Sequence, residues 1–162
     1  MKSSIATICI LGLVGMVVGV AVQGADTAPV TATVTVQNIS VSVSDGTVAY
    51  GIIAAGASQD TATLGDTQTA KNEGNVTANL NIRGTDSAAW TLAETASGAT
   101  NYRHAFSKDI FVTEDFLTLS NKTLALSVAP AGTQAFDLKI TTPPSADNFT
   151  EQSVNVTVQA TI

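Results

Sequence analysis

The alternation of apolar and polar side chains over Thr31–Ser44 is the most regular pattern near the start of the chain. Every second residue is apolar, in two sets: Ala32, Val34 and Val36, then Ile39, Val41 and Val43. A period of two places such side chains on one face of an extended strand. The phase slips by one residue at Gln37–Asn38, which turns all later side chains to the opposite face. We therefore expect the strand to bulge, change sheets or change partners there.

The same alternation recurs further along the chain between turn signals such as Asp45–Gly46 and Pro130–Gly132. It predicts strands over Thr47–Ile52, Thr61–Leu64, Val76–Ile82, Ala88–Leu92, Tyr102–Phe106, Leu124–Val128, Phe136–Ile140 and Val154–Ile162. The last of these, about nine residues, would be close to 30 Å long. Trp90 is expected to be the largest core residue.

The number of short strands and the lack of helical periodicity after the first residues predict an all-β fold. We expect a single antiparallel β-sandwich, of jelly-roll or immunoglobulin-like type, formed by residues 37–162. No segment repeats at a fixed period, which excludes a solenoid or a propeller.

Residues 1–24 have the composition of a secretory signal helix. One lysine, Lys2, precedes an almost wholly apolar run over Ile5–Val22, and small residues follow, so we expect cleavage after Gly24 or Ala25. An uncleaved membrane anchor and a type IV pilin helix are the alternatives, because about 18 apolar residues can just span a bilayer. Cleavage would remove Cys9, the one cysteine, and leave an exported domain without a disulfide.

Charge and composition exclude several classes of function. The net charge of −6 becomes −7 once Lys2 is removed, which argues against nucleic acid and anionic membranes as partners. One histidine, no thiol after cleavage and no phosphate-binding glycine loop predict a protein that is not an enzyme and holds no cofactor. His104 is expected to be a half-buried strand residue rather than a base, and zinc has too few ligands.

Two weaker patterns concern calcium and glycans. The densest acidic group is Asp109, Glu114 and Asp115, which could supply oxygen ligands to calcium, although solvated loop acids are the simpler interpretation. The Asn-x-Ser/Thr pattern of N-glycosylation occurs five times, at Asn38, Asn75, Asn121, Asn148 and Asn155. Threonine-rich strands also generate this pattern for packing reasons, which fits Asn155 and Asn38 best.

The first and last predicted strands lack the residues that usually protect a sheet edge. Neither Thr31–Ser44 nor Val154–Ile162 contains a lysine, arginine, proline or acid. Both strands should therefore be covered. Either they lie inside one sandwich, with a bulge at Gln37–Asn38, or residues 25–36 leave the domain and complete a neighbour's sheet through Ala32, Val34 and Val36. Head-to-tail contacts of the second kind propagate a filament.

Three segments carry a resemblance to a known family: ATVTVQNISVSVSDGTVAYG, NEGNVTANLNIRGTDSAAWTL and APAGTQAFDLKITTPP with VNVTVQATI. They resemble the TasA/camelysin-like fibre proteins and related archaeal bundling pilins in strand pattern and order. The resemblance implies a jelly-roll subunit, exported by the general pathway and polymerised by donation of its N-terminal strand, here residues 25–36. It implies no catalytic residues.

The expectation from the sequence is thus an extracellular filament or matrix subunit that forms a homopolymer by strand exchange. The alternative is a monomeric cell-surface module that binds a glycan or a cell-wall polymer.

Overall fold

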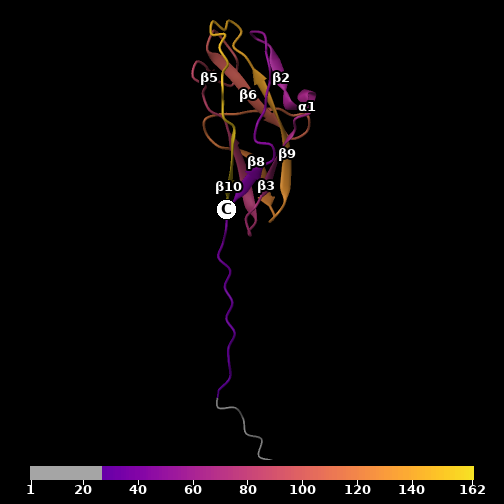
Figure 1. The fold of residues 1–162 in the computed structure, drawn as a ribbon, viewed down its shortest axis with the longest axis vertical. Helices are drawn as coiled ribbons and strands as arrows, with labels where there is room; N and C mark the ends of the chain where they lie inside the picture. Colours follow the sequence, from indigo (N-terminus) through magenta and orange to yellow (C-terminus); the bar gives the residue numbers. More distant parts are fainter. Residues whose placement is uncertain (1–26) are drawn as a thin grey trace, which may run out of the picture. The chain divides into compact units, whose positions relative to one another are not determined.

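The computed structural model describes residues 27–162, and this part of the chain is nearly all β (Figure 1). The predicted signal segment 1–24, with Cys9, lies outside the described residues. The elements are β1 (Val41–Val43), β2 (Ser58–Asp60), α1 (Thr61–Leu64), β3 (Gln68–Asn72), β4 (Ala78–Arg83), β5 (Thr91–Leu92), β6 (Asn101–Ser107), β7 (Asp115–Phe116), β8 (Lys122–Val128), β9 (Thr133–Thr141) and β10 (Thr157–Thr161). Over residues 27–162, no helix is long and apolar enough to cross a bilayer.

The larger sheet has the strand order β1-β3-β9-β6-β5, with β2 paired to β9 and β7 paired to β6. Its pairings are antiparallel except that of β5 with β6, where Thr91 lies opposite Asn101 in a parallel pair. Residues 93–100 form the loop that brings the chain from the end of β5 back beside its start. The bridge between Ser97 and Asn101 closes this loop. The sheet is therefore mixed, and the expectation of a purely antiparallel arrangement is wrong at this edge.

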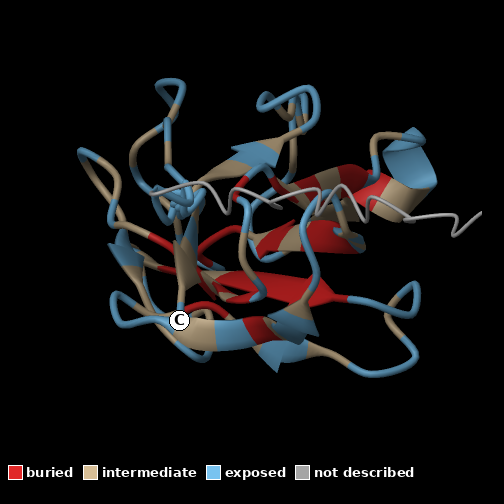
Figure 2. Cartoon of the chain, turned by 90° about the horizontal axis from the view of Figure 1, so that it is seen from below, coloured by how far each residue is buried: buried red, intermediate tan, exposed pale blue. Residues whose placement is uncertain are grey.

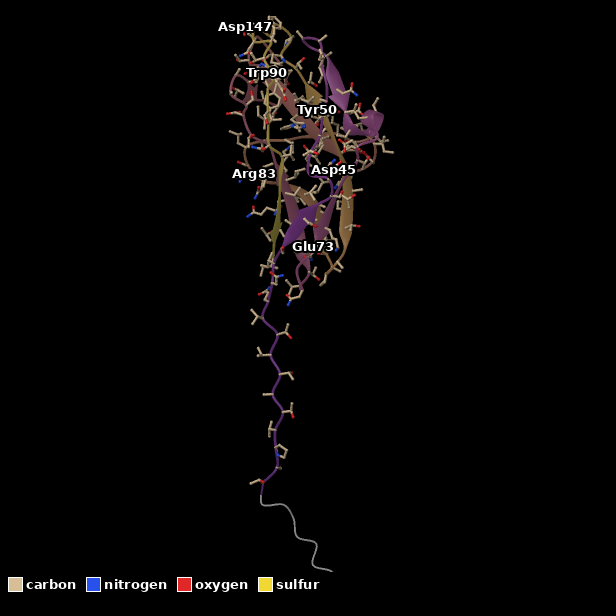
Figure 3. All side chains as sticks on the ribbon, viewed as in Figure 1. Asp45, Tyr50, Glu73, Arg83, Trp90 and Asp147 are labelled. Atoms are coloured by element: carbon tan, nitrogen blue, oxygen red, sulfur yellow. The ribbon has the colours of Figure 1, made fainter. Side chains whose placement is uncertain are left out.

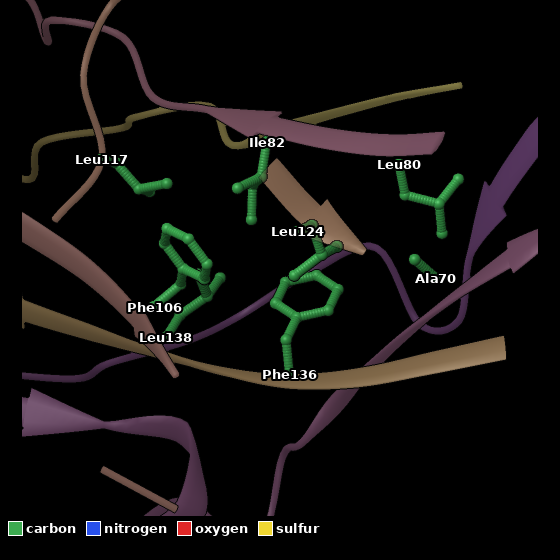
Figure 4. Close-up of a cluster of buried hydrophobic side chains, with 8 residues drawn as sticks. All are labelled: Ala70, Leu80, Ile82, Phe106, Leu117, Leu124, Phe136 and Leu138. Atoms are coloured by element: carbon green, nitrogen blue, oxygen red, sulfur yellow. The ribbon is translucent and has the colours of Figure 1, made fainter. Parts of the chain in front are cut away.

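The smaller sheet has the order β10-β4-β8 and is antiparallel throughout. Alternation along β4 sends Ala78, Leu80 and Ile82 inward, and all three are buried. Figure 4 shows Leu80, Ile82 and Leu124 from this sheet with Phe136 and Leu138 of β9 in one cluster. One core thus joins the two sheets, and Figure 2 shows the buried residues in the inner strands with exposed loops around them.

The prediction that Trp90 is the largest core residue is wrong. Trp90 is half-buried, whereas Tyr102 and Phe136 are the largest fully buried side chains. Tyr102 is held by a hydrogen bond from its hydroxyl to the carbonyl of Thr85, and its ring lies 6.1 Å from that of Trp90. Burial of a phenol needs such an acceptor, which the alternation pattern does not report.

Four predicted strands differ in the structure. Of Ala88–Leu92 only Thr91–Leu92 is a strand, and Ala88 and Ala89 form a bend. Thr61–Leu64 forms the helical turn α1, because the Asp60 side chain accepts a hydrogen bond from the Thr63 N–H at its N-terminus and Gly65 adopts φ 71° at its end. Thr47–Ile52 belongs to no ladder, and Gly51 within it has φ 73°. The final strand is shorter than expected, since pairing begins only at Thr157.

Candidate functional site

An open groove lies between two segments of the chain, residues 46–55 and 146–158. It consists of two adjoining cavities of about 280 Å³ and 670 Å³. Both cavities are lined by Val48, Tyr50, Ile140, Glu151 and Gln152. The floor includes Phe136, Leu138 and Ile140 of β9, which are already buried. We call this feature the open groove and the two segments its walls.

Most of each wall takes no part in a backbone ladder, although the N–H groups of Thr150 and Asn155 donate to side-chain oxygens. Within the described part of the chain, residues 47–53 and 147–156 make no backbone–backbone hydrogen bond. Both segments nevertheless keep the alternation of a strand. Val48 and Tyr50 are half-buried between exposed neighbours on one wall, as are Val154 and Val156 on the other. The first wall is interrupted at Gly51, which has φ 73°, and the second at a bend at Thr150.

The two walls run in opposite directions. The smaller cavity brings residues 43–50 against 151–158, and the larger one brings residues 48–55 against 146–152. Residue numbers that increase along the first wall therefore face residue numbers that decrease along the second wall. The first wall continues β1 of the larger sheet and the second leads into β10 of the smaller sheet, so the groove separates the edges of both sheets.

One polar contact fastens the first wall to the floor. The Tyr50 hydroxyl lies 2.9 Å from Nε2 of His104, a residue of β6 that is 2 % exposed. Burial lowers the pKa of His104 to about 4, so the ring is neutral near pH 7. Its Nδ1 has no hydrogen-bond partner among the described residues. The sequence predicted a half-buried histidine, and the structure buries it fully beside the groove.

The predicted donor segment is exposed where the structure describes it. Residues 27–39 are exposed throughout, and residues 27–36 belong to no strand. The exposed fraction is 92 % for both Val30 and Val34 and 82 % for Val36. Soluble proteins rarely leave a row of large apolar side chains in solvent unless another surface covers it.

The phase slip coincides with a contact of the chain with residues 73–75, which we call the exit contact. The Asn75 side chain accepts a hydrogen bond from the Asn38 N–H (2.7 Å) and donates one to the Val36 carbonyl (2.8 Å). The Asn75 N–H adds a bond to the Asn38 carbonyl. Gly74 permits this approach, because a Cβ there would lie 2.5 Å from the Asn38 oxygen. The Asn-x-Thr pattern at Asn75 gives no signal of this role.

The three acids proposed for calcium have separate partners. Glu114 is ion-paired with both Arg103 and Lys139, and Asp115 lies 2.6 Å from the Lys122 ammonium. Asp109 accepts hydrogen bonds from the Thr113 N–H and the Ser107 hydroxyl, which lower its pKa. Over residues 27–162, no three His, Cys, Asp or Glu side chains are grouped to hold a metal ion.

The five Asn-x-Ser/Thr asparagines occupy different environments. Asn38 and Asn75 belong to the exit contact. Asn155 lies in the second wall, and its N–H donates to the Thr85 hydroxyl. The Asn121 amide donates to Gln159 (2.6 Å) across the smaller sheet. Asn148 lines the larger cavity and accepts hydrogen bonds from the N–H and hydroxyl of Thr150.

Comparisons with known proteins find no matching family model, no matching curated protein and no matching solved structure. The groove and the exit contact are therefore interpreted from their own geometry.

Proposed function

We propose that this protein is a non-catalytic extracellular subunit of a filament or matrix, assembled when residues 25–36 of one copy enter the open groove of the next. In this proposal residues 1–24 are an export signal, and the two sheets form a sandwich of jelly-roll or immunoglobulin-like type that lacks one strand. The partner is another copy of the same chain.

The observation that carries the proposal is the pair of unpaired walls. Extended backbone with free N–H and C=O groups is a template for another strand, and proteins usually cover or blunt such edges. Here two segments without backbone ladder partners face each other across the groove. An inserted strand would pair with their free groups and place its apolar face against the half-buried Val48, Val154 and Val156.

The N-terminal segment has the matching pattern. Val30, Ala32, Val34 and Val36 share one face, and threonines at 31, 33 and 35 share the other. Ten extended residues span about 33 Å. The segment therefore has the alternation and the length of a strand.

Magnitudes indicate which interactions such an assembly needs. Burial of three valine side chains is worth about 5–9 kcal/mol in total, whereas association costs about 4–15 kcal/mol. Apolar contact alone would thus give weak assembly. Backbone hydrogen bonds to both walls, each worth about 0.5–1.5 kcal/mol net, would supply the remainder.

The alternative function is a monomeric surface module in which the groove binds a glycan or a cell-wall polymer. The Asn148, Gln152 and Glu151 side chains beside the larger cavity offer polar groups to such a ligand. This alternative gives the exposed valine face no role, which is why strand donation is preferred.

Deletion of residues 25–36 tests the proposal directly. We expect a folded domain with an unchanged circular dichroism spectrum that forms no filaments in negative-stain images. Filaments from the truncated chain, or none from the full-length protein, would reject strand donation.

A point-substitution pair provides the matched control. Val34→Asp places a charge on the apolar face and should abolish filaments, while Thr33→Asp places the same charge on the opposite face and should permit them. Both positions are exposed in the single chain, so neither change should affect its folding.

A further inference from the structure

The five Asn-x-Ser/Thr asparagines differ in what their side-chain nitrogens do. The Asn75 nitrogen donates a hydrogen bond to the Val36 carbonyl, and the Asn121 nitrogen donates one to the Gln159 side chain. N-glycosylation forms a covalent bond to this nitrogen, so either asparagine would first have to give up its hydrogen bond. Within residues 27–162, the side-chain nitrogen donates no hydrogen bond in the remaining three, which are Asn38, Asn148 and Asn155.

Two of these three patterns lie in backbone that is held by partners. The Asn38 N–H and carbonyl are both bonded to Asn75, within the exit contact. The Asn155 N–H donates to the Thr85 hydroxyl, and Thr157, the threonine of its pattern, begins β10. Neither stretch is free to bend toward an enzyme while the domain is folded.

Asn148 has a different arrangement. Its Oδ1 accepts hydrogen bonds from the Thr150 N–H (2.9 Å) and from the Thr150 hydroxyl (2.6 Å). Its loop carries no ladder, because residues 147–156 make no backbone–backbone hydrogen bond in the described part of the chain. Figure 3 shows Asp147, the preceding residue, at one end of the body, and Phe149, the following residue, is 88 % exposed. The Asn148 side chain therefore belongs to an accessible loop.

The two hydrogen bonds to Oδ1 favour chemistry at the Asn148 nitrogen. A carboxamide nitrogen is a weak nucleophile, because its lone pair is delocalised onto the carbonyl oxygen. When Nδ2 loses a proton, the negative charge resides mostly on Oδ1, where the N–H and hydroxyl of Thr150 are already placed to stabilise it. The hydroxyl that the Asn-x-Ser/Thr pattern requires thus has a defined role at this site.

We infer that Asn148 is an N-glycosylation site, and that it is the one of the five asparagines that the folded domain presents to a glycosyltransferase. The co-substrate is a saccharide whose C1 is bonded to the phosphate of a polyprenyl lipid. The Nδ2–C1 bond forms as the C1–O bond breaks, the lipid phosphate leaves with the bonding electron pair, and one Nδ2 proton passes to a base of the transferase. This inference rests on the export step of the proposed function, but not on strand donation.

The position of the glycan bears on the open groove. Asn148 lines the larger cavity and not the smaller one. A saccharide on its nitrogen would therefore flank the larger cavity and the exposed Phe149 ring, and leave the smaller cavity open. A hydrophilic group beside that ring would hinder non-specific association through it.

Peptide mass spectrometry of the full-length protein, purified from the cells that produce it, tests the assignment. Trypsin leaves Asn148 and Asn155 in one peptide, because Lys139 is the last lysine or arginine of the chain, whereas cleavage after Glu151 separates them. We expect the saccharide on the peptide that contains Asn148 and the other four asparagines largely unmodified.

Matched variants separate the acceptor from its surroundings. Asn148→Gln and Thr150→Ala should each abolish the modification, whereas Thr150→Ser keeps the hydroxyl and should retain it. Asn121→Gln is the control, because it changes another asparagine of the pattern and should leave the modification at Asn148 as it is. None of these positions is in the buried core, so each variant should fold.

The outcomes that contradict the assignment are distinct. A saccharide on another asparagine with Asn148 bare would overturn it, and so would similar occupancy of all five, which means that transfer acts before the chain folds. An exported chain without any saccharide would overturn this inference and leave the proposed function intact. A chain retained inside the cell would reject the export step together with this inference, whereas loss of filaments in negative-stain images would bear on strand donation alone.

Discussion

Two regions of this protein have nearly the same sequence pattern and very different backbone bonding. They are β9, which we call the closed side, and the walls of the open groove, which we call the open side. On the closed side, Phe136, Leu138 and Ile140 of β9 alternate with polar residues, and the strand pairs with β3, β2 and β6. On the open side, Val154 and Val156 alternate equally well, yet their segment has no ladder. Alternation reports which face of a strand meets the core. It does not report whether a neighbour is present.

The largest expected effect lies on the closed side. Phe136→Ala removes a side chain that is 2 % exposed and should lower the free energy of unfolding by about 3–5 kcal/mol. Val154→Ala, on the open wall, should cost clearly less because its side chain is only half-buried. Urea denaturation of the monomeric variants measures both. Equal losses would show that the open side is as tightly packed as the closed side.

The dependence of the unfolding free energy on pH tests the contact between the two sides, which is the hydrogen bond between Tyr50 and His104. Burial lowers the pKa of His104 from 6.5 to about 4, so protons bind more readily to the unfolded chain between these values. Stability from this group is complete above pH 6.5 and is lost as the pH falls toward 4, by about 3 kcal/mol. His104→Gln should flatten this part of the stability profile, whereas an unchanged slope would assign it to other groups.

The exit contact should contribute a smaller, local effect. Asn75→Ala removes the side-chain bonds to Val36 and Asn38 at an exposed site and should cost about 1 kcal/mol. Hydrogen exchange should accelerate at the Asn38 amide but not in β9. Asn121→Ala is the matched control, because it removes an exposed asparagine bond elsewhere. Faster exchange throughout β9 would mean that the contact supports the whole fold.

Calcium should have the smallest effect of all. Because Glu114 is paired with Arg103 and Lys139, and Asp115 with Lys122, a bound ion would have to displace these cations. We expect the thermal midpoint to be the same with added calcium and with a chelator. A rise of several degrees on adding calcium would restore these acids as a candidate site.

Much of the closed side could be predicted from sequence, and physical reasons explain the rest. Alternation identified β4, β6 and β9, whose inward residues are buried as expected. It could not distinguish the turn α1 from a strand, because four residues do not separate the two periods and the Asp60 cap decides. It also predicted Trp90 to be the largest core residue, because alternation carries no information on which aromatic ring finds a hydrogen-bond acceptor for its polar atom.

For the open side, the sequence indicated which segments lack edge-protecting residues but not which backbone groups are hydrogen-bonded. The lack of charged or proline residues in the first and last strands indicated edges that need cover. The phase slip at Gln37–Asn38 marked the position where Asn75 binds the chain. The groove itself brings together residues about 100 positions apart, such as Tyr50 and Gln152, which line the same cavities and which no local pattern relates.

The pairing beside the exit contact has a mechanical consequence. Residues 38–44 run antiparallel to residues 69–75, through β1 and β3 and the backbone bonds on either side of them. Such hydrogen bonds lie perpendicular to the strands. A pull on residue 36 along the direction of β1 therefore loads them side by side, in shear, and they must fail together rather than one at a time. The place where the chain enters the body is thus built to resist tension along its own axis.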